Sequence, residues 1–173
     1  YGEFQQLSNR MARGFDAQGV KRGDKVALMM SNCPDFLAVT FGLAKLGAVS
    51  VPINTAYKGD LLEHVLNSSD SCMMVVDEEW TPRIGAIEAQ LPALAKVIVR
   101  NSMSAAVPKG LAKETLNLRS LKDHGASAPE IVIDHGETQA LIYTSGTTGP
   151  SKGVKIAHAH GLTAGEIFID AVD

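Results

Sequence analysis

Apolar residues recur every three or four positions in several parts of the chain, which is the spacing that aligns them along one face of a helix. The clearest case is the stripe formed by Phe4, Leu7, Met11 and Phe15. Gly19 follows this stripe and is the expected C-cap, because glycine readily adopts the left-handed conformation that ends many helices. The first residues of the chain therefore predict an amphipathic helix.

A second helix is expected to begin after Asn32 and to end at Gly47. The side-chain oxygen of Asn32 suits the cap, and Pro34 suits the first helical turn. Shorter patterns of the same kind predict helices over residues 60–67 and 83–91.

Short apolar runs alternate with these helical stretches and are typical of buried strands. They cover Lys25–Met30, Val49–Ile53, Cys72–Val76, Lys96–Arg100 and Gln139–Tyr143. Strands that alternate with helices form parallel β-α-β units in which the helices cover the sheet. The pattern therefore predicts an α/β fold with a mostly parallel sheet flanked by helices.

Residues 101–136 break this alternation. They are rich in Ser, Pro and Gly and contain only short apolar runs. We expect an irregular connection there, with one helical turn near Leu118–Asp123.

The composition limits the class of protein. With 45% hydrophobic and 20% charged residues, the chain is a folded globular domain rather than a disordered segment. Lys and Arg number 16 against 19 Asp and Glu, which gives a net charge of −3. Nucleic acid is not expected as the main partner, because binding it requires a basic surface.

The cysteines and one long apolar stretch bear on the compartment. Cys33 and Cys72 lie in apolar runs and are expected to be buried free thiols in a reducing, cytoplasmic environment. No CxxC or HxxxH pattern supports a zinc site. Phe36–Ile53 is a largely apolar stretch with a single charge, Lys45, which would cost about 3 kcal/mol near the centre of a bilayer. No transmembrane segment is therefore expected.

Hydroxyl residues, glycines and one lysine are concentrated at Thr144–Val154, directly after the last predicted strand. Glycines let backbone N–H groups point into one concavity, and Ser and Thr hydroxyls donate to phosphate oxygens or bind Mg²⁺. Lys152 adds a mobile positive charge. These features predict a polyphosphate-binding loop over residues 143–154. A solvated hairpin without a ligand has the same composition and remains an alternative.

The order of the residues is more specific than their composition. The loop is not a Walker A sequence, because Lys152 lies between Ser151 and Gly153. The string YTSGTTGPSKGV at 143–154 instead resembles the phosphate-binding signature of the adenylate-forming superfamily, which includes acyl-CoA synthetases, luciferases and peptide-synthetase adenylation domains. Tyr1–Arg10 and Leu43–Asn54 are also similar to this family. The resemblance covers nearly the whole chain and is weakest over residues 101–136.

One position departs from the family signature. The family usually has Pro directly before the lysine, whereas here Ser151 precedes Lys152 and Pro150 lies one position earlier. The change affects the backbone path into Lys152 rather than the class of ligand.

The resemblance also implies roles for individual residues. The residues expected to bind the β- and γ-phosphates of ATP are Thr144, Ser145, Gly146, Thr147, Thr148, Gly149 and Lys152. Lys152 has the catalytic role of holding the charge of departing pyrophosphate, and Thr144 is the one candidate ligand for Mg²⁺. His158 matches a family histidine, although packing or capping a helix is its simpler role. His158 and His160 lack a third metal ligand nearby in the sequence.

The family reaction activates a carboxylic acid with Mg-ATP, which gives acyl-AMP and pyrophosphate, and CoA then usually displaces AMP. The resemblance therefore implies ATP, Mg²⁺ and coenzyme A as cofactors and a small carboxylic acid as substrate. Asn54–Leu62 is similar to CoA ligases for fatty or carnitine-like acids, which favours an acyl-CoA synthetase. A peptide-synthetase adenylation module and a non-catalytic nucleotide-binding module remain alternatives.

The resemblance implies that residues 1–173 form an incomplete N-terminal AMP-binding domain. The family's acidic Mg²⁺ partner, its adenine and acyl contacts and the lysine of its C-terminal domain would all follow Asp173. We therefore expect the 173-residue chain to be inactive on its own. We also expect it to expose apolar surface that favours homo-oligomers.

Overall fold

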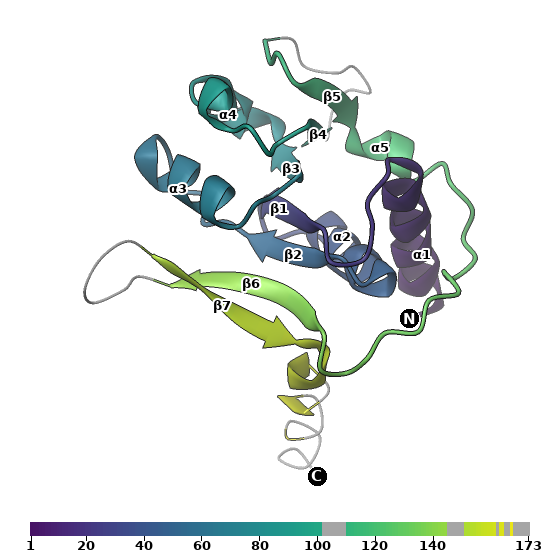
Figure 1. The fold of residues 1–173 in the computed structure, drawn as a ribbon. Helices are drawn as coiled ribbons and strands as arrows, with labels where there is room; N and C mark the ends of the chain where they lie inside the picture. Colours follow the sequence, from purple (N-terminus) through teal and green to yellow (C-terminus); the bar gives the residue numbers. More distant parts are fainter. Residues whose placement is uncertain (102–109, 145–150, 162, 165–166, 168–173) are drawn as a thin grey trace.

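The computed structural model describes residues 1–101, 110–144, 151–161, 163–164 and 167. Within them, a seven-stranded sheet has the order β5-β4-β3-β1-β2-β6-β7, with helices on both of its faces (Figure 1). Every neighbouring pair of strands is parallel except β6 and β7. The predicted α/β fold with a mostly parallel sheet is confirmed.

The strands are β1 (Lys25–Met29), β2 (Val49–Pro52), β3 (Met73–Asp77), β4 (Lys96–Arg100), β5 (Glu114–Asn117), β6 (Thr138–Thr144) and β7 (Lys152–Ala157). The helices are α1 (Gly2–Ala17), α2 (Pro34–Leu46), α3 (Asp60–Ser68), α4 (Thr81–Gly85) and α5 (Leu118–Leu121). Two 3-10 turns, η1 (Glu78–Trp80) and η2 (Glu88–Gln90), flank α4. The five strands predicted from apolar runs end within one residue of the observed bounds.

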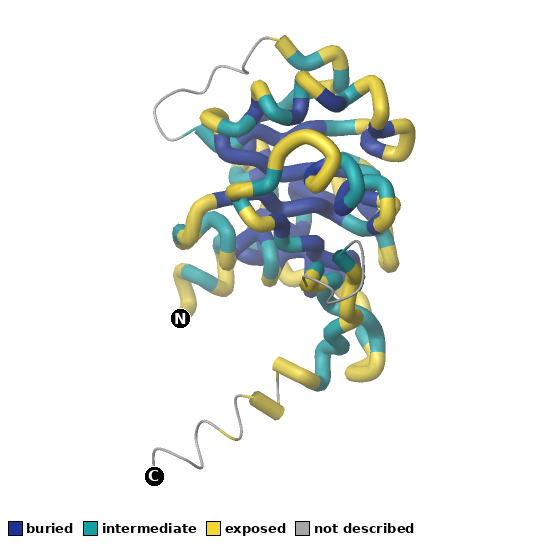
Figure 2. The backbone as a smooth tube through the Cα atoms, turned by 90° about the vertical axis from the view of Figure 1, so that its left-hand side faces the viewer, coloured by how far each residue is buried: buried dark blue, intermediate teal, exposed yellow. Residues whose placement is uncertain are grey.

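The core consists of two apolar layers, one on each face of the sheet. Helices α1, α2 and α5 cover one face, whereas α3 and α4 cover the other. Alternate residues of β1 enter opposite layers, with Val26 and Leu28 on one face and Ala27 and Met29 on the other. A strand that is buried on both faces must be apolar throughout, which is why these runs were readable in the sequence. Figure 2 shows the buried residues gathered in the middle of the sheet.

The ends of the first two helices differ slightly from the prediction. Gln18 is the C-cap of α1, and Gly19 follows it with a φ of +92°. At α2 the N-cap is Cys33 rather than Asn32, and the Cys33 sulfur accepts a hydrogen bond from the Phe36 N–H at 3.4 Å. Pro34 explains the shift, because the residue before a proline is held in the extended conformation that a cap requires.

Two predictions about the middle of the chain were wrong. The helix expected over 83–91 is broken into α4 and the 3-10 turn η2, and Gly85, a weak helix former, is the last residue of α4. The connection over 101–136 is not irregular throughout, because β5 extends the sheet by pairing in parallel with β4. The helical turn expected near Leu118–Asp123 is confirmed as α5.

The cysteines and the membrane prediction can also be compared with the structure. Cys33 and Cys72 are both free, but they are half-buried rather than buried, and they lie at the margin of one core layer. The apolar stretch over Phe36–Ile53 is divided between α2 and β2. Across the described residues, no helix is both long and apolar enough to span a bilayer.

Candidate functional site

The sequence placed the candidate phosphate site in a loop over residues 143–154. The structure instead assigns residues 143–144 to β6 and residues 152–154 to β7, a strand that was not predicted, and the two strands form an antiparallel hairpin. Thr144, the last residue of β6, lies directly opposite Lys152, the first residue of β7. Both side chains are exposed. The structure therefore brings together two of the predicted site residues. The other five, Ser145, Gly146, Thr147, Thr148 and Gly149, lie outside the described residues.

The hairpin opens at the edge of the sheet where ligands usually bind. Strand β6 is parallel to β2, so Thr144 lies at the same edge as the carboxyl ends of β1 to β4. In open α/β sheets this is the edge where ligands are held. The position of the hairpin is therefore consistent with a ligand-binding role for its open end.

The tip of the hairpin contains a close contact across its two strands. Tyr143 is paired with Gly153, and a Cβ atom added to Gly153 would lie 3.2–3.4 Å from the Tyr143 ring carbons and hydroxyl. Glycine at this position therefore leaves room for the tyrosine ring to lie across β7. The Tyr143 hydroxyl also forms a hydrogen bond of 2.8 Å with the Ser68 hydroxyl of α3.

Helix α3 makes a second contact at the other strand of the hairpin. His64 Nε2 lies 3.0 Å from the carbonyl oxygen of Ser151, the residue before Lys152. Because a carbonyl oxygen only accepts hydrogen bonds, Nε2 of His64 carries the hydrogen. Sequence reasoning did not identify His64 or Ser68. The signal was their spacing of four residues, which places them on one face of α3.

The two C-terminal histidines of the sequence analysis have different surroundings. His160 Nδ1 accepts a hydrogen bond from the Ala157 N–H at 3.0 Å, which is a local contact at the end of β7. His158 Nε2 is buried and has no hydrogen-bond partner, and burial lowers the pKa of this imidazole. The described residues contain no group of three His, Cys, Asp or Glu side chains that could hold a metal ion.

His158 and Lys45 both line a pocket of about 550 Å³ between α1, α2 and the start of β6. The Lys45 ammonium donates to Ser8 Oγ at 2.7 Å and to Asn9 Oδ1 at 2.6 Å. Partial burial lowers the pKa of Lys45. Because its ammonium already has partners in α1, Lys45 joins α1 to α2.

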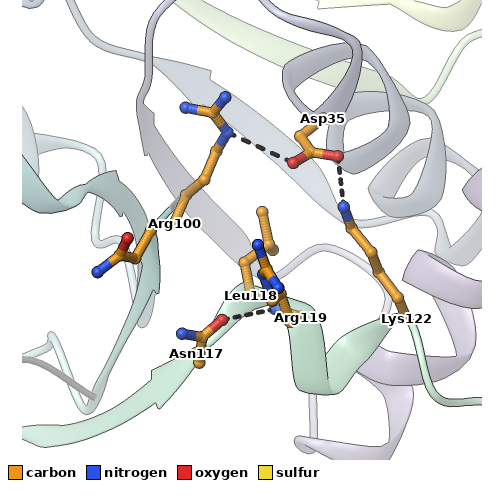
Figure 3. A pocket seen from close by; sticks show the side chains of 7 residues that line it. Asp35, Arg100, Asn117, Leu118, Arg119 and Lys122 are labelled. Atoms are coloured by element: carbon orange, nitrogen blue, oxygen red, sulfur yellow. Dashed lines mark hydrogen bonds and ion pairs between the residues drawn. The ribbon is translucent and has the colours of Figure 1, made fainter. Parts of the chain in front are cut away.

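A second charged pocket, of about 440 Å³, lies at the carboxyl ends of β4 and β5. Figure 3 shows the Asp35 carboxylate between Arg100 and Lys122, which lie 3.4 Å and 2.7 Å from its two oxygens. Arg100 also contacts the buried Asp77 at 3.0 Å, and Asp77 accepts a further hydrogen bond from the Ser31 N–H. These charges are paired with one another, and strands β3, β1 and β2 separate this pocket from the hairpin. We interpret the cluster as a structural ion-pair network that links α2 to β3, β4 and the end of α5.

The fold and the hairpin define a mostly parallel α/β domain with an exposed threonine and lysine at the edge formed by the carboxyl ends of its parallel strands. Residues 1–170 match the family model of AMP-binding enzymes, and this chain belongs to that family.

The relatives that it resembles are acyl-CoA ligases. The chain is 33% identical over 165 residues to a crotonobetaine/carnitine–CoA ligase of Escherichia coli strain SE11, and this match covers 95% of the chain and 32% of the relative. The chain thus spans about a third of the length of the curated relatives it matches.

Solved structures of similar fold also include a CoA ligase. The fold is similar to that of the anthranilate CoA ligase AuaEII in complex with anthranoyl-AMP, with a TM-score of 0.83 and 27% identity over 93% of this chain and 30% of the other. It is also similar to the inhibitor-bound N-terminal domain of FACL13 from Mycobacterium tuberculosis, with a TM-score of 0.77 and 32% identity over 91% of this chain and 37% of that domain.

Proposed function

We propose that this chain is part of an AMP-forming acyl-CoA synthetase and binds the β- and γ-phosphates of ATP. In the proposed reaction a carboxylic acid becomes acyl-AMP and then a CoA thioester. The observation that carries the proposal is the pairing of Thr144 with Lys152 at the open end of the hairpin. The segment between them resembles the family's phosphate-binding signature.

The chemistry of these two residues fits the leaving group of adenylation. When the carboxylate attacks the α-phosphorus, the bond to the bridging oxygen breaks and its electron pair leaves with pyrophosphate. The Lys152 ammonium and the Thr144 hydroxyl would then donate to oxygens on which negative charge is growing. Each charge-assisted hydrogen bond of this kind contributes about 1.5–3 kcal/mol.

Magnesium fits the same site. Thr144 presents an exposed hydroxyl oxygen, which is the kind of hard ligand that Mg²⁺ accepts beside phosphate oxygens. Bound there, Mg²⁺ would neutralise part of the phosphate charge. The roles of Ser145, Gly146, Thr147, Thr148 and Gly149 rest on the resemblance of their sequence to the signature.

A fatty or carnitine-like acid is the proposed substrate. This choice is supported by the similarity of Asn54–Leu62 to CoA ligases for such acids and by the crotonobetaine/carnitine–CoA ligase among the relatives. An adenylation module of the peptide-synthetase type would share the first half-reaction but would deliver its acyl group to a carrier-bound thiol instead of free CoA.

ATP–pyrophosphate exchange tests the proposal in an enzyme that contains this chain at the length of its relatives. Exchange should depend on a fatty or carnitine-like acid, and addition of CoA should release AMP and form the thioester. ATP binding without exchange, for any acid in a broad panel, would identify a non-catalytic nucleotide-binding module. Exchange without CoA consumption would favour the carrier-protein alternative.

The 173-residue chain alone is expected to give no exchange above background. The acid must be placed in line with the α-phosphate, and adenine and ribose must also be held. In the proposed enzyme other parts of the protein supply those contacts. Acid-dependent exchange by the isolated chain would show that it contains a complete site.

A further inference from the structure

Helix α3 presents two different faces to its surroundings. Leu62, Val65 and Leu66 are buried in the core layer beneath the sheet. His64 and Ser68 lie one helical turn apart on another face and contact the β6–β7 hairpin. The buried residues fix the helix on the sheet, so its hairpin-facing side chains start from a rigid support.

The two side chains reach different sides of the hairpin, Ser68 at β6 and His64 at the residue before β7. Ser68 meets the hydroxyl of Tyr143 in β6, one residue before Thr144. His64 donates to the carbonyl oxygen of Ser151, one residue before Lys152. Each contact is therefore adjacent in sequence to one of the two paired residues that frame the proposed phosphate-binding segment.

Strand β6 is held by β2 and by the core layer that contains α3, because Leu141 and Tyr143 pack against that layer. Ser50 of β2 pairs with Ala140 of β6, and Ser50 Oγ also donates to the Gln139 carbonyl at 3.3 Å. Residues 141–144 of β6 continue beyond this pair toward the end of the hairpin that carries Thr144 and Lys152 (Figure 1). Thr144 and Lys152 lie beyond these anchors, at the end of the hairpin where α3 makes its two contacts.

We propose that His64 and Ser68 are positioning residues, which hold both strands of the hairpin so that Thr144 and Lys152 face the same phosphate group. This inference rests on the proposed function. In this role both side chains act through the hairpin rather than through contact with substrate. By restricting the hairpin, they lower the conformational entropy that Lys152 and Thr144 lose when they bind the developing charge of pyrophosphate. The His64 contact requires only an N–H donor, which neutral imidazole supplies as well as imidazolium.

Amide hydrogen exchange measured by NMR on the 173-residue chain tests the positioning directly. Replacing His64→Leu or Ser68→Ala should speed exchange of the Tyr143, Thr144, Lys152 and Gly153 amides by roughly three- to tenfold, because each variant removes one hydrogen bond from the hairpin. Amides of β1 should keep their rates. Asn67→Ala is the matched control, since Asn67 lies on the same helix but donates to the Gln90 carbonyl at 3.0 Å.

Conservative variants separate positioning from a general loss of stability. His64→Gln keeps an N–H donor and Ser68→Thr keeps the hydroxyl, so both should retain slow exchange at the hairpin. Ser68→Ala and Tyr143→Phe remove the two halves of one hydrogen bond. In the double variant, the hairpin amides should therefore exchange no faster than in either single variant.

The enzyme assay links positioning to chemistry. In the longer enzyme, His64→Leu should lower the kcat of ATP–pyrophosphate exchange by about tenfold while leaving the KM for the acid unchanged, with partial recovery in His64→Gln. Unchanged amide exchange in both His64→Leu and Ser68→Ala would overturn the inference, whatever the activity. Faster amide exchange in a protein that shows neither pyrophosphate binding nor adenylation would leave the contact in place but overturn the proposed function, and with it the catalytic consequence of positioning.

Discussion

Gly42 of α2 lies so close to Met11 of α1 that a Cβ atom added to the glycine would be 2.7 Å from the Met11 Cβ. Real Cβ atoms do not approach so closely, so the two helices touch through the bare backbone of Gly42. Met11 is fully buried there. The contact sets the distance between the two helices that cover one face of the sheet.

Gly42→Ala is therefore expected to destabilise the protein even though alanine favours helices. Forcing the helices apart should cost about 1–3 kcal/mol, which corresponds to a fall in Tm of roughly 2–10 °C for a chain of this size. Gly2→Ala is the control, because no atom lies within 4 Å of a Cβ added at Gly2 in the first turn of α1. Thermal unfolding that shows equal stability for both variants would contradict the close contact.

A second prediction concerns the ion pair between Arg22 and Glu137, which joins the start of β1 to the start of β6. Arg22 Nε donates to Glu137 Oε2 at 2.8 Å, and a second guanidinium nitrogen contacts the other carboxylate oxygen. Hydrogen bonding to Arg22 lowers the pKa of Glu137 below its ordinary value of 4.5. A lowered carboxylate pKa stabilises the fold above the unfolded pKa, and this contribution is lost as the pH falls through the folded value.

Glu137→Gln should accordingly be less stable than the unsubstituted chain at neutral pH. The difference should shrink as the pH falls below the ordinary glutamate pKa of 4.5 and disappear once Glu137 is protonated in the folded chain. Added salt should also reduce the difference, because both side chains reach solvent. Urea unfolding across this pH range measures the effect, with the exposed Glu130→Gln as control. A difference in stability that persists in acid would point to packing rather than charge.

A third prediction follows from the half-buried imidazole of His158, whose Nε2 atom is buried. Burial lowers its pKa from the ordinary 6.5, with the Glu137 charge acting in the opposite direction. The unfolded chain therefore binds a proton at this position before the folded chain does. The resulting loss of stability begins as the pH falls through about 6.5 and continues down to the folded pKa.

His158→Gln should make stability less dependent on pH between about pH 7.5 and about pH 5.5. His135→Gln is the control, since the His135 side chain is 79% exposed. Lys45 lines the same pocket and stays charged over this range, so it adds no proton uptake of its own. An NMR titration that gives His158 a pKa of 6.5 or higher in the folded chain would contradict the prediction.

The parts of the fold that were predictable from sequence are those whose local pattern is set by burial. Strand β3, in the middle of the sheet, is buried on both faces, and its residues Met73–Val76 therefore form an apolar run in the sequence. Strand β5 was missed because it lies at the edge and includes Glu114 and Thr115, so its pairing with β4 decides its conformation. Propensity alone does not distinguish such a segment from a loop.

The candidate site shows the same division. Thr144 and Lys152 were predicted because the signature residues are contiguous in sequence. His64 and Ser68 were not, because polar residues at a spacing of four on a helix usually face solvent. Their relation to the hairpin depends on contacts between positions 75 and 87 residues apart, which only the packed structure provides.

The last prediction concerns Lys152 in the proposed enzyme. Lys152→Ala should lower the rate of ATP–pyrophosphate exchange by roughly 10- to 100-fold, because it removes one charge-assisted contact worth about 1.5–3 kcal/mol to the departing pyrophosphate. The loss should appear mainly in kcat, since the charge on the leaving group is greatest in the transition state.

Lys155→Ala provides the matched control for Lys152→Ala, because Lys155 is an exposed lysine of the same strand and its paired residue is Leu141 rather than Thr144. The control should keep its exchange rate, and both variants should unfold at the same temperature as the unsubstituted enzyme. Lys152→Arg should recover only part of the activity, because a guanidinium keeps the charge but presents a broader, planar group at the mouth of the hairpin. Equal rates of ATP–pyrophosphate exchange in Lys152→Ala and Lys155→Ala would show that Lys152 does not stabilise the charge of departing pyrophosphate. The pairing of Thr144 with Lys152 would then be a feature of the fold alone.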